Sequence, residues 1–372
     1  MQKFEWMGNI GIKMLKSIDV RIESIEPLET PSALMERYPV SPELTASILD
    51  SRAQVNAIIK GTDRRLLAIV GPCSIHDPQA ALQYAKQLKE LAGEVQDEMY
   101  IVMRTYFEKP RTIGGWKGFI LDPLLDGSYN IQKGIAMARK LLIDITSLGV
   151  PVGCEMLDPI VPQYIDEMLS WGAVGARTTE SQTHRTLASG MSVAMGFKNS
   201  TSGECATAIN AIKSSQEKAA FIGVDKEGNL AIYKTTGNDC GHLILRGGDH
   251  APNYYEEEIE VASSLMEKLK ITPSIIIDCS HANSRKNPSR QKRVLRAVID
   301  QVIWGHKEIR GFMLESNLYP GCQALGDDAG QLAYGVSITD GCIGWDETVE
   351  VIRRTYATLK AGKRELGGVL NA

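Results

Sequence analysis

Short apolar runs alternate with longer amphipathic stretches along most of the chain, beginning at Leu66. Short apolar runs bounded by turn signals are typical of strands that are buried on both faces. We expect eight strands, at residues 66–70, 100–104, 151–156, 173–178, 193–198, 242–246, 274–280 and 311–316. Helical patterns lie between or after them at residues 79–91, 130–148, 162–171, 204–214, 255–270, 288–304 and 346–359.

Eight strand-then-helix units in succession predict an α/β fold of the (β/α)8 TIM-barrel type. The alternative is an open parallel sheet with helices on both faces. No Gly-rich phosphate-binding loop of the dinucleotide or P-loop kind follows any of the strands, which argues against that alternative. One interruption, residues 221–236, has a Glu-Gly-Asn turn between two alternating runs, and it predicts a β-hairpin inserted before the sixth strand.

The chain before the barrel pattern predicts an N-terminal arm. The first 17 residues show no clear period, whereas the stretch from Asp19 alternates as a short strand does. Two helix starts are expected at Thr30-Pro31 and Ser41-Pro42, because a hydroxyl residue before proline caps a helix well. We therefore divide the chain into an arm of one strand and two helices, residues 1–60, and a barrel, residues 61–365.

Composition narrows the classes of function. The chain has 372 residues, 43% of them hydrophobic and 23% charged, and its formal net charge is -4. So small a net charge gives no support to a nucleic-acid or membrane partner. No apolar run approaches the roughly 20 residues that cross a bilayer. The seven cysteines lack CxxC spacing and no signal-sequence pattern opens the chain, so we expect a cytoplasmic protein.

Polar residues end or follow all eight expected strands, and a barrel gathers the carboxyl ends of its strands on one face. These residues are Cys73, Arg104, Glu155, Arg177, Lys198, Arg246, His281 and Glu315. A single one is usually a solvated loop position, but eight in succession indicate a charged pocket. Lys109 and Arg111, in the loop FEKPRT, add to its basic members. So many cations favour a ligand with several phosphate or carboxylate groups, and their two clusters suggest two phosphorylated groups.

A second set of residues at the same face has the composition of a metal site. Cys73, His281, Glu315 and Asp340 offer one thiolate, one imidazole and two carboxylates, which suit a divalent first-row transition ion better than Mg²⁺ or Ca²⁺. Taken singly, a buried Cys is more often a small core residue, and a lone His is more often just hydrogen-bonded. A nucleophilic Cys73 is a weaker alternative, because His76 in the same loop has no evident third residue to orient it.

Eight segments together resemble one enzyme family, the microbial type I 3-deoxy-D-arabino-heptulosonate 7-phosphate (DAHP) synthases. The segments are GPCSIHDP, RTYFEKPRT, GWKG, GARTTESQTHR, GFKNST, LRGGDHAPNY, DCSHANS and SITDGCIGWDET. The resemblance runs from about Arg21 to about Leu359. It implies a metal-dependent transferase that condenses phosphoenolpyruvate with erythrose 4-phosphate and water, releasing phosphate, in the first step of the shikimate pathway of aromatic amino-acid biosynthesis. The fold it implies is a (β/α)8 barrel with an N-terminal arm.

The resemblance also assigns the site residues. The implied metal ligands are Cys73, His281, Glu315 and Asp340, for Mn or Fe, with Co or Zn as further options. The implied phosphoenolpyruvate contacts are Arg104, Glu155, Arg177, Lys198 and Arg246, and the sugar-phosphate contacts are Lys109, Arg111 and Thr112. Catalytic roles fall to Lys109, Lys198 and Glu155. It stays open whether Lys198, Glu155 or a water that they hold transfers protons.

In regulated members of this family the arm extends across a dimer interface and helps to bind an inhibitory aromatic amino acid. The aligned positions are Asp19, Pro162, Gln163, Leu187, Ser192, Phe221 and Gly223. Gly223 and Pro159 resemble the tyrosine-responsive relatives, since a glycine leaves room for a phenol oxygen. The alternative is that the arm only covers the base of the barrel. We expect a homodimer or homotetramer.

Two loops depart from the pattern of many relatives. Ile113-Gly114 stands in place of Thr-Val, and residues 199–203 read NSTSG in place of Asn-Gly-Thr-Asp-Gly. Neither change removes a charged group. A 3-deoxy-octulosonate 8-phosphate synthase, which uses arabinose 5-phosphate, is the alternative within the same chemistry, and the Lys-Pro-Arg-Thr loop argues against it. A catalytically silent barrel that senses phosphorylated metabolites or an aromatic amino acid is the other alternative, but we would expect it to have lost a metal ligand.

Overall fold

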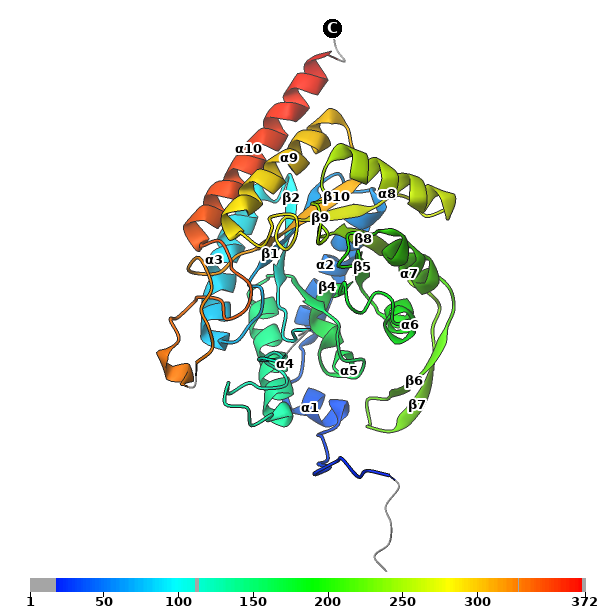
Figure 1. Ribbon diagram of the computed structural model, residues 1–372, viewed down its shortest axis with the longest axis vertical. Helices are drawn as coiled ribbons and strands as arrows, with labels where there is room; N and C mark the ends of the chain where they lie inside the picture. The colour runs from blue at the N-terminus through cyan, green and yellow to red at the C-terminus, as the bar shows by residue number, and fades with distance from the viewer. Residues whose placement is uncertain (1–17, 111–113, 327, 370–372) are drawn as a thin grey trace, which may run out of the picture.

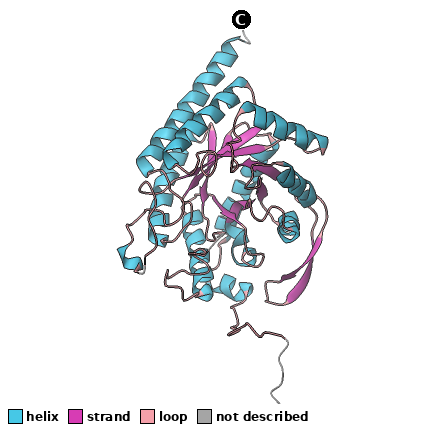
Figure 2. Cartoon of the chain, viewed as in Figure 1, coloured by secondary structure: helices cyan, strands magenta, loops and turns pink. Residues whose placement is uncertain are grey.

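The barrel is closed and parallel. The computed structural model describes residues 18–110, 114–326 and 328–369, with side chains described up to residue 362. Within these residues, eight strands close in the order β1-β10-β9-β8-β5-β4-β3-β2. They are β1 (Leu66–Gly71), β2 (Met99–Arg104), β3 (Val152–Glu155), β4 (Leu169–Val174), β5 (Ala194–Lys198), β8 (Gly241–Leu245), β9 (Ile275–Asp278) and β10 (Ile309–Glu315). Helices surround them (Figure 2), so the predicted (β/α)8 fold is confirmed.

Each barrel strand is followed by a helix before the next barrel strand or the end of the chain. These helices are α3 (Pro78–Val95), α4 (Ile131–Ser147), α5 (Pro162–Ile165), α6 (Gln182–Gly190), α7 (Ala206–Gln216), α8 (Glu256–Lys268), α9 (Gln291–Trp304) and α10 (Trp345–Val369). Short 3-10 turns occur at Asp166–Met168, Pro288–Arg290 and Ala329–Gln331. The last helix, α10, lies beside α9 at the outside of the molecule (Figure 1). None of the described helices is both long and apolar enough to cross a membrane.

The strands are apolar along their whole length because both of their faces are buried. In β1, Leu67 and Ile69 belong to the apolar cluster inside the barrel, whereas Ala68 and Val70 belong to the larger cluster that includes the surrounding helices. Successive side chains of a strand point to opposite faces, so a run that is apolar throughout serves both clusters. This double burial holds the ends of the strands in place around the site described below.

Two helices precede the barrel, and both begin at the predicted residues. In α1 (Pro31–Arg37) the cap is Thr30, whose Oγ1 accepts a hydrogen bond from the Ala33 amide at 3.3 Å. In α2 (Pro42–Lys60) the cap is Ser41, whose Oγ accepts from the Leu44 amide at 3.2 Å. The hydroxyl residues therefore satisfy amides that the first helical turn leaves unpaired.

The second of these helices closes the amino-terminal end of the barrel. Val55, Ile58 and Ile59 of α2 belong to the inner apolar cluster. The Ile59 carbonyl accepts a hydrogen bond of 3.0 Å from Ser274, which immediately precedes β9. The second helix of the predicted arm is thus packed against the barrel, and it leaves the carboxyl ends of the strands open.

The strand predicted from Asp19 is absent: residues 18–30 contain only bends, a turn and backbone without regular secondary structure. A strand needs a neighbouring strand to complete its hydrogen bonds, and none lies beside this segment within the described residues. Its apolar side chains are exposed: Ile18, Val20, Ile22 and Ile25.

Two other predictions around β4 are wrong. The strand was expected at residues 173–178 and lies at Leu169–Val174, and the helix expected to reach residue 171 ends before it. All six residues of β4 are buried, so its sequence shows no alternation that would distinguish a strand from the end of a buried helix. The helix α6 was not predicted, because few of its residues are apolar.

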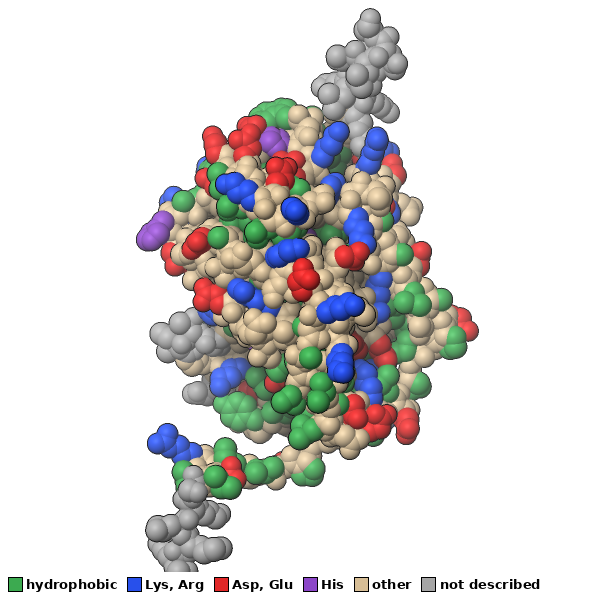
Figure 3. All heavy atoms as spheres, turned by 90° about the vertical axis from the view of Figure 1, so that its right-hand side faces the viewer, with side chains coloured by type: hydrophobic (Ala, Val, Ile, Leu, Met, Phe, Trp, Pro, Cys, Tyr) green, Lys and Arg blue, Asp and Glu red, His purple; other side chains and the backbone are tan. Residues whose placement is uncertain are grey.

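The inserted hairpin is confirmed. β6 (Ala220–Val224) and β7 (Leu230–Lys234) pair antiparallel, with Ile222 opposite Ile232. The hairpin projects along one side of the molecule (Figure 1). Ile222, Leu230 and Ile232 are 80%, 83% and 74% exposed. Figure 3 views that side of the molecule, where apolar side chains gather in the lower half.

Candidate active site

A cavity of about 260 Å³ opens where the carboxyl ends of the barrel strands meet. Its charged lining residues are Arg104, Lys109, Glu155, Arg177, Lys198, Arg246, His281, Lys286 and Asp340. Arg104, Glu155 and Lys198 are the last residues of their strands, and Arg246 follows β8 directly. The face that the sequence predicted to be charged is therefore one cavity.

The ends of neighbouring strands come close together at this face. Gly71, the last residue of β1, has φ 154°, and a Cβ there would lie 3.0 Å from the backbone N and O of Arg104. Only a glycine allows so close an approach without displacing the backbone. At the other side of the cavity the Arg246 amide donates a 2.7 Å hydrogen bond to Asn199 Oδ1, which ties β8 to the end of β5.

Lys198 and Glu155 form a buried ion pair inside the cavity. Lys198 Nζ donates to Glu155 Oε2 at 2.8 Å. Burial alone would raise the pKa of Glu155, but Lys198 and then Lys109 and His281 lower it below its usual value. Glu155 is therefore a carboxylate at neutral pH, held against a cation.

A second buried ion pair joins Arg104 to Glu315, with Nη2 3.2 Å from Oε1. The guanidinium lies 4.1 Å from the ring centroid of Tyr106, and Lys198 Nζ lies 5.4 Å from the same centroid. Arg104 Nη1 has no hydrogen-bond partner among the described residues. A buried guanidinium with an unpaired donor is suited to an anionic ligand. Sequence reasoning passed over Tyr106, although it lies within the RTYFEKPRT segment.

Three of the four predicted metal ligands form a tight cluster. One ligand atom each of Cys73, Glu315 and Asp340 lie within 4.8 Å of one another. Cys73 Sγ is 3.6 Å from Asp340 Oδ2, and Lys109 Nζ donates to the same sulfur at 3.1 Å. Burial first, and then Glu315, raise the pKa of the Cys73 thiol to about 11, although Lys109 acts in the opposite direction. The side chains of Cys73, Lys109, Glu315 and Asp340 therefore lie close together although they are far apart in the sequence.

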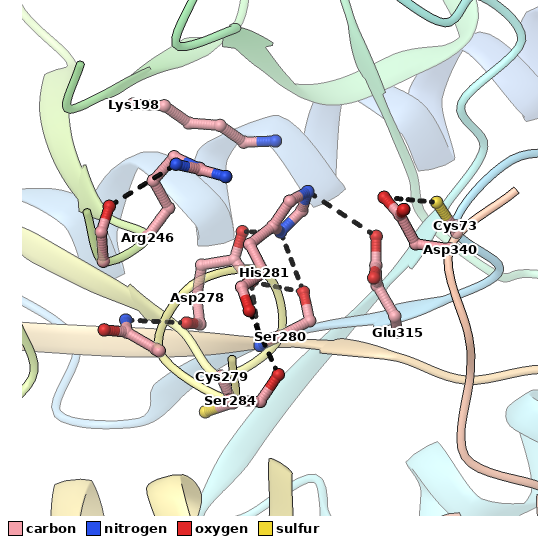
Figure 4. A network of polar contacts seen from close by, with 12 residues as sticks. Cys73, Lys198, Arg246, Asp278, Cys279, Ser280, His281, Ser284, Glu315 and Asp340 are labelled. Atoms are coloured by element: carbon pink, nitrogen blue, oxygen red, sulfur yellow. Dashed lines mark hydrogen bonds and ion pairs between the residues drawn. The ribbon is translucent and has the colours of Figure 1, made fainter. Parts of the chain in front are cut away.

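His281 lies beside this cluster. Its Nε2 is 3.8 Å from Glu315 Oε1, and its Nδ1 is 2.8 Å from Asp278 Oδ2. Figure 4 shows the imidazole between Lys198 and Arg246 on one side and Glu315, Asp340 and Cys73 on the other. Asp278 thus orients His281 so that Nε2 faces the carboxylate of Glu315.

Asp278 is a functional residue that sequence reasoning missed. It is fully buried at the end of β9, and His281, Lys198 and Arg104 hold its pKa well below the usual range although burial opposes them. The available signal was an acidic residue that ends the apolar run SIII. A buried charge in such a place needs a partner, which here is the imidazole three residues later.

The cluster of Cys73, Glu315 and Asp340, with His281 beside it, has the donor atoms of a site for a divalent transition ion. Ligands lie about 2.0–2.3 Å from such an ion, so two of them are separated by up to roughly 4.6 Å. The spread of the cluster is close to this limit, and one sulfur, two carboxylates and one imidazole suit Mn, Fe, Co or Zn. The Asp278–His281 contact is the outer-shell support that metal-binding histidines usually have.

The remaining predicted substrate residues differ in position. Arg177 is exposed at the rim of the cavity, three residues beyond β4, because that strand ends earlier than predicted. Lys109 is partly buried beside Cys73. Arg111 and Thr112, together with Ile113 of the departing loop, lie outside the described residues.

The predicted effector residues lie away from the cavity, on the outside of the barrel. Lys226 of the hairpin loop donates a 2.6 Å hydrogen bond to the Gln163 carbonyl in α5, which joins the hairpin to the barrel wall. Pro162 and Leu187 are buried, whereas Ser192 is exposed. Asp19 is exposed in the arm.

The space predicted beside Gly223 is filled by the side chain of Tyr233. Phe221 and Tyr233 stack with their ring centroids 5.2 Å apart. A Cβ at Gly223 would lie 3.0 Å from two ring atoms of Tyr233. The glycine therefore makes room for the ring of Tyr233, whose hydroxyl donates to the Val224 carbonyl at 2.9 Å.

Comparison with known proteins shows the family of the chain. The model of the DAHP synthetase I family matches residues 39–353. The Tyr-sensitive phospho-2-dehydro-3-deoxyheptonate aldolase of Escherichia coli (strain K12) is 47% identical over 341 residues, which cover 92% of this chain and 96% of that protein. The phospho-2-dehydro-3-deoxyheptonate aldolase of Haemophilus influenzae is 48% identical over 90% of this chain and 92% of its own length.

Solved structures agree as well. The phospho-2-dehydro-3-deoxyheptonate aldolase of Francisella tularensis SCHU S4 superposes with a TM-score of 0.89 at 44% identity, covering 91% of this chain and 98% of that one. Similarity of this extent includes the barrel, α2 and every described residue of the cavity. The chain belongs to the DAHP synthetase I family.

Proposed function

We propose that the protein is a DAHP synthase, which condenses phosphoenolpyruvate with erythrose 4-phosphate and water to give DAHP and phosphate, the first step of the shikimate pathway. One observation carries the proposal. Among the described residues, six cationic side chains line a cavity that adjoins the Cys73, Glu315 and Asp340 cluster. The cations suit two phosphorylated substrates and the cluster suits a divalent ion. Relatives that share nearly half of its residues are named for this activity.

The buried cations bind phosphoenolpyruvate in this proposal. Arg104, Lys198 and Arg246 are buried and line the cavity, so they suit the carboxylate and phosphate of this substrate. Arg177 at the rim adds a fourth charge. Holding two anions that repel each other in reacting position is worth several kcal/mol, within the roughly 7–11 kcal/mol that positioning can supply.

The metal cluster acts on the sugar. A divalent transition ion held by Cys73, His281, Glu315 and Asp340 would polarise the aldehyde oxygen, which makes the carbonyl carbon a better electrophile. Lys109, 3.1 Å from Cys73 Sγ, stabilises the thiolate that such a ligand requires.

The Lys198–Glu155 pair handles protons in this proposal. C3 of phosphoenolpyruvate adds to the aldehyde carbon, and positive charge develops at C2, where water adds. Glu155, ionised and buried, accepts the proton of that water. Lys198 donates a proton to the phosphate oxygen as the carbon–oxygen bond of the hemiketal phosphate breaks. The hemiketal hydroxyl loses its proton as C2 becomes the ketone, and the former aldehyde oxygen gains one to become a hydroxyl, so both protons of the water are accounted for. The two residues are within hydrogen-bonding distance, so the proton can return between turnovers.

The test is consumption of phosphoenolpyruvate by chelator-treated protein, with and without Mn²⁺, in the presence of erythrose 4-phosphate or arabinose 5-phosphate. We expect Mn²⁺-dependent consumption with the four-carbon sugar only. A preference for the five-carbon sugar would assign the protein to the octulosonate chemistry, and consumption with neither sugar would leave a sensor of phosphorylated metabolites.

The role of His281 can be tested separately. We expect His281→Ala to lower Mn²⁺-dependent turnover by at least about 100-fold, because loss of a ligand exceeds the 10–100-fold effect of outer-shell changes. The control is His306→Ala, which removes a histidine that pairs with Glu256 and Glu308 away from the cavity. Near-normal turnover of His281→Ala at low Mn²⁺ would remove His281 from the site.

Feedback regulation by an aromatic amino acid, tyrosine in particular, is part of this proposal. We assign residues 1–60 to regulation and to a homodimeric or homotetrameric interface, and residues 61–365 to catalysis. Its support is the Tyr-sensitive names of several relatives and the contacts of the hairpin with α5 and α6.

Removing residues 1–27 tests this assignment and spares both the cap Thr30 and the ion pair of Glu29 with Arg37. The shortened protein should keep its turnover and lose inhibition by tyrosine. Unchanged inhibition by every aromatic amino acid would show that the arm has no part in feedback.

A further inference from the structure

A groove of about 410 Å³ lies on the outside of the barrel, between α9 and α10. These two helices run side by side at one edge of the molecule (Figure 1). Among the described residues, none lines both this groove and the cavity at the carboxyl ends of the strands. The groove is therefore a second concave site, and the proposed reaction gives it no role.

The floor of the groove is apolar. It consists of Leu295 and Ile299 from α9 and Val351 from α10, all of them buried. The three side chains belong to the large apolar cluster that packs the helices on the barrel. Because close packing in the core holds these residues in place, the floor has a fixed shape.

The rim of the groove is charged, and cations outnumber carboxylates. Four cations and two carboxylates line it, an excess of two positive charges: Lys292, Arg293, Arg296 and Arg354 against Asp300 and Glu350. The chain as a whole has a net charge of -4, so this local excess has the opposite sign. A basic rim around an apolar floor attracts anions.

Two arginines of the rim lack an acidic partner. Among the described residues, Lys292 pairs with Glu347, but no carboxylate lies within 4.0 Å of Arg296 or Arg354. Both arginines are exposed, and they come from the two different helices that border the groove. Their guanidinium groups are therefore free to bind a ligand from both sides of the groove.

The size and chemistry of the groove suit a small molecule. Guanidinium groups bind carboxylates and phosphates through paired hydrogen bonds, and the aliphatic stems of arginines add apolar surface above the floor. Sites for small molecules have volumes of roughly 300–1,000 Å³, a range that includes this groove. A stable protein interface buries about 800 Å² on each partner, far more than a floor of three side chains offers.

We propose that the groove between α9 and α10 binds a small organic anion. Its acidic group lies between Arg296 and Arg354, and its apolar part lies on the floor. The carboxylate of Glu350 lines the same rim, and among the described residues it has no cation within 4.0 Å, so it acts against binding. The inference does not depend on the proposed function, because the groove and the cavity are separate.

The test uses anilinonaphthalene sulfonate, an aromatic anion whose fluorescence increases in apolar sites, as the probe. Phosphoenolpyruvate is present throughout to occupy the cations of the barrel cavity. Arg296→Gln and Arg354→Gln should each raise the Kd of the probe by at least about threefold at low salt, since each removes a charged hydrogen-bond donor that salt would screen.

The matched control is Arg353→Gln. Arg353 is exposed beside Arg354 on α10, but it pairs with Glu94 of α3 and does not line the groove. Its variant loses the same charge and should change the Kd of the probe less than about twofold, because Glu94 already neutralises that charge. Thermal unfolding of each variant checks that the fold is intact.

Two further measurements separate charge from other effects. Glu350→Gln should lower the Kd of the probe, because it removes a carboxylate that repels the anion. Phenylnaphthylamine, a neutral analogue without the sulfonate, should bind with the same Kd to the wild type and to all of these variants.

Equal Kd values of the probe in Arg296→Gln, Arg354→Gln and Arg353→Gln would overturn the inference, since the probe would then bind elsewhere. Weaker binding by Glu350→Gln would also overturn it. So would a neutral analogue that distinguishes the variants as strongly as the sulfonate does, because the arginines would then act through their stems and not through their charge.

Discussion

The ion pair of Lys198 and Glu155 is nearly closed to solvent, with side chains 5% and 7% exposed. Two charges in such a place depend on each other, because neither can be solvated by water when its partner is removed. The cavity already has an excess of positive charge, so loss of the Glu155 carboxylate increases the repulsion among Lys198, Lys109 and Arg104. At the residue scale, the fold is therefore destabilised when one member of the Lys198–Glu155 pair loses its charge.

We expect Glu155→Gln to lower the free energy of unfolding by about 3 kcal/mol, the cost of breaking a buried pair. The control is Glu94→Gln, which breaks the exposed pair of Glu94 with Arg353 and should change the free energy of unfolding much less, because water solvates both exposed charges. Urea unfolding at pH 7 measures both values. Equal effects would show that solvent reaches the Lys198–Glu155 pair.

His242 makes stability dependent on pH. It is fully buried, Trp171 Nε1 donates to its Nε2 at 3.0 Å, and its Nδ1 is 3.2 Å from the Cys240 carbonyl. Burial lowers the pKa of His242 to about 4, against a small opposite effect of the Cys240 carbonyl. The neutral ring is thus favoured in the folded state, and the unfolded chain takes up a proton at higher pH.

The stability that neutral His242 contributes is present above pH 6.5 and is lost as the pH falls toward 4, by up to about 3 kcal/mol. In His242→Gln this part of the pH dependence should disappear. The measurement is the difference in unfolding free energy between wild type and variant from pH 7 to pH 4, in which the other titrating groups cancel. Parallel pH profiles would contradict the assignment.

At the scale of elements, glycines show where a helix is pressed against its neighbour. Gly134 in α4 is buried, and a Cβ there would lie 2.1 Å from the Ile120 carbonyl oxygen. Gly93 in α3 is exposed, with nothing within 4 Å of an added Cβ. A side chain at Gly134 would clash with the neighbouring loop, whereas one at Gly93 would meet no other atom.

Gly134→Ala should destabilise the protein by about 1–3 kcal/mol, because the loop that contains Ile120 must move. Gly93→Ala should stabilise it by about 0.5–1 kcal/mol, since alanine favours the helix. Thermal unfolding of the two variants, which carry the same chemical change, gives the comparison. A stabilising Gly134→Ala would mean that α4 is packed more loosely than its contacts indicate.

At the scale of the whole molecule, the arm and the hairpin leave apolar surface exposed. Ile18, Val20, Ile22 and Ile25 are exposed in the arm, as are Ile222, Leu230 and Ile232 in the hairpin. Exposed apolar patches of this kind mark interaction surfaces. In the expected homo-oligomer, a second copy of the chain would cover this surface.

If this face of the hairpin forms the proposed homo-oligomeric interface, Ile222→Asp combined with Ile232→Asp should shift the protein toward monomer, because charges replace exposed apolar side chains while the barrel is untouched. Val261→Asp, a change at a similarly exposed valine on α8, is the control and should keep the wild-type assembly. Sedimentation velocity at several protein concentrations distinguishes the two results. An unchanged assembly in the double variant would exclude this face of the hairpin from the interface.

The sequence by itself determined the features that depend on neighbouring residues. The caps Thr30 and Ser41, the hairpin turn and most strands were predicted correctly, because each arises from contacts within a few residues. The chemical types at the strand ends were also predicted, since a barrel brings those ends to one face whatever the details of its packing. The residue types at the strand ends and their convergence on one face together predict the charged cavity.

Only the tertiary structure decided which polar residues meet. The contact of Cys73 with Asp340 spans 267 positions and depends on closure of the barrel. The orientation of His281 by Asp278, and the position of Lys286 in the cavity, depend on a strained turn that no residue pattern predicts. The shift of β4 has the same origin: a run buried on both faces has no period, so its ends are set by the surrounding packing. Local chemistry fixes local structure, whereas contacts between distant residues exist only after the chain has closed on itself.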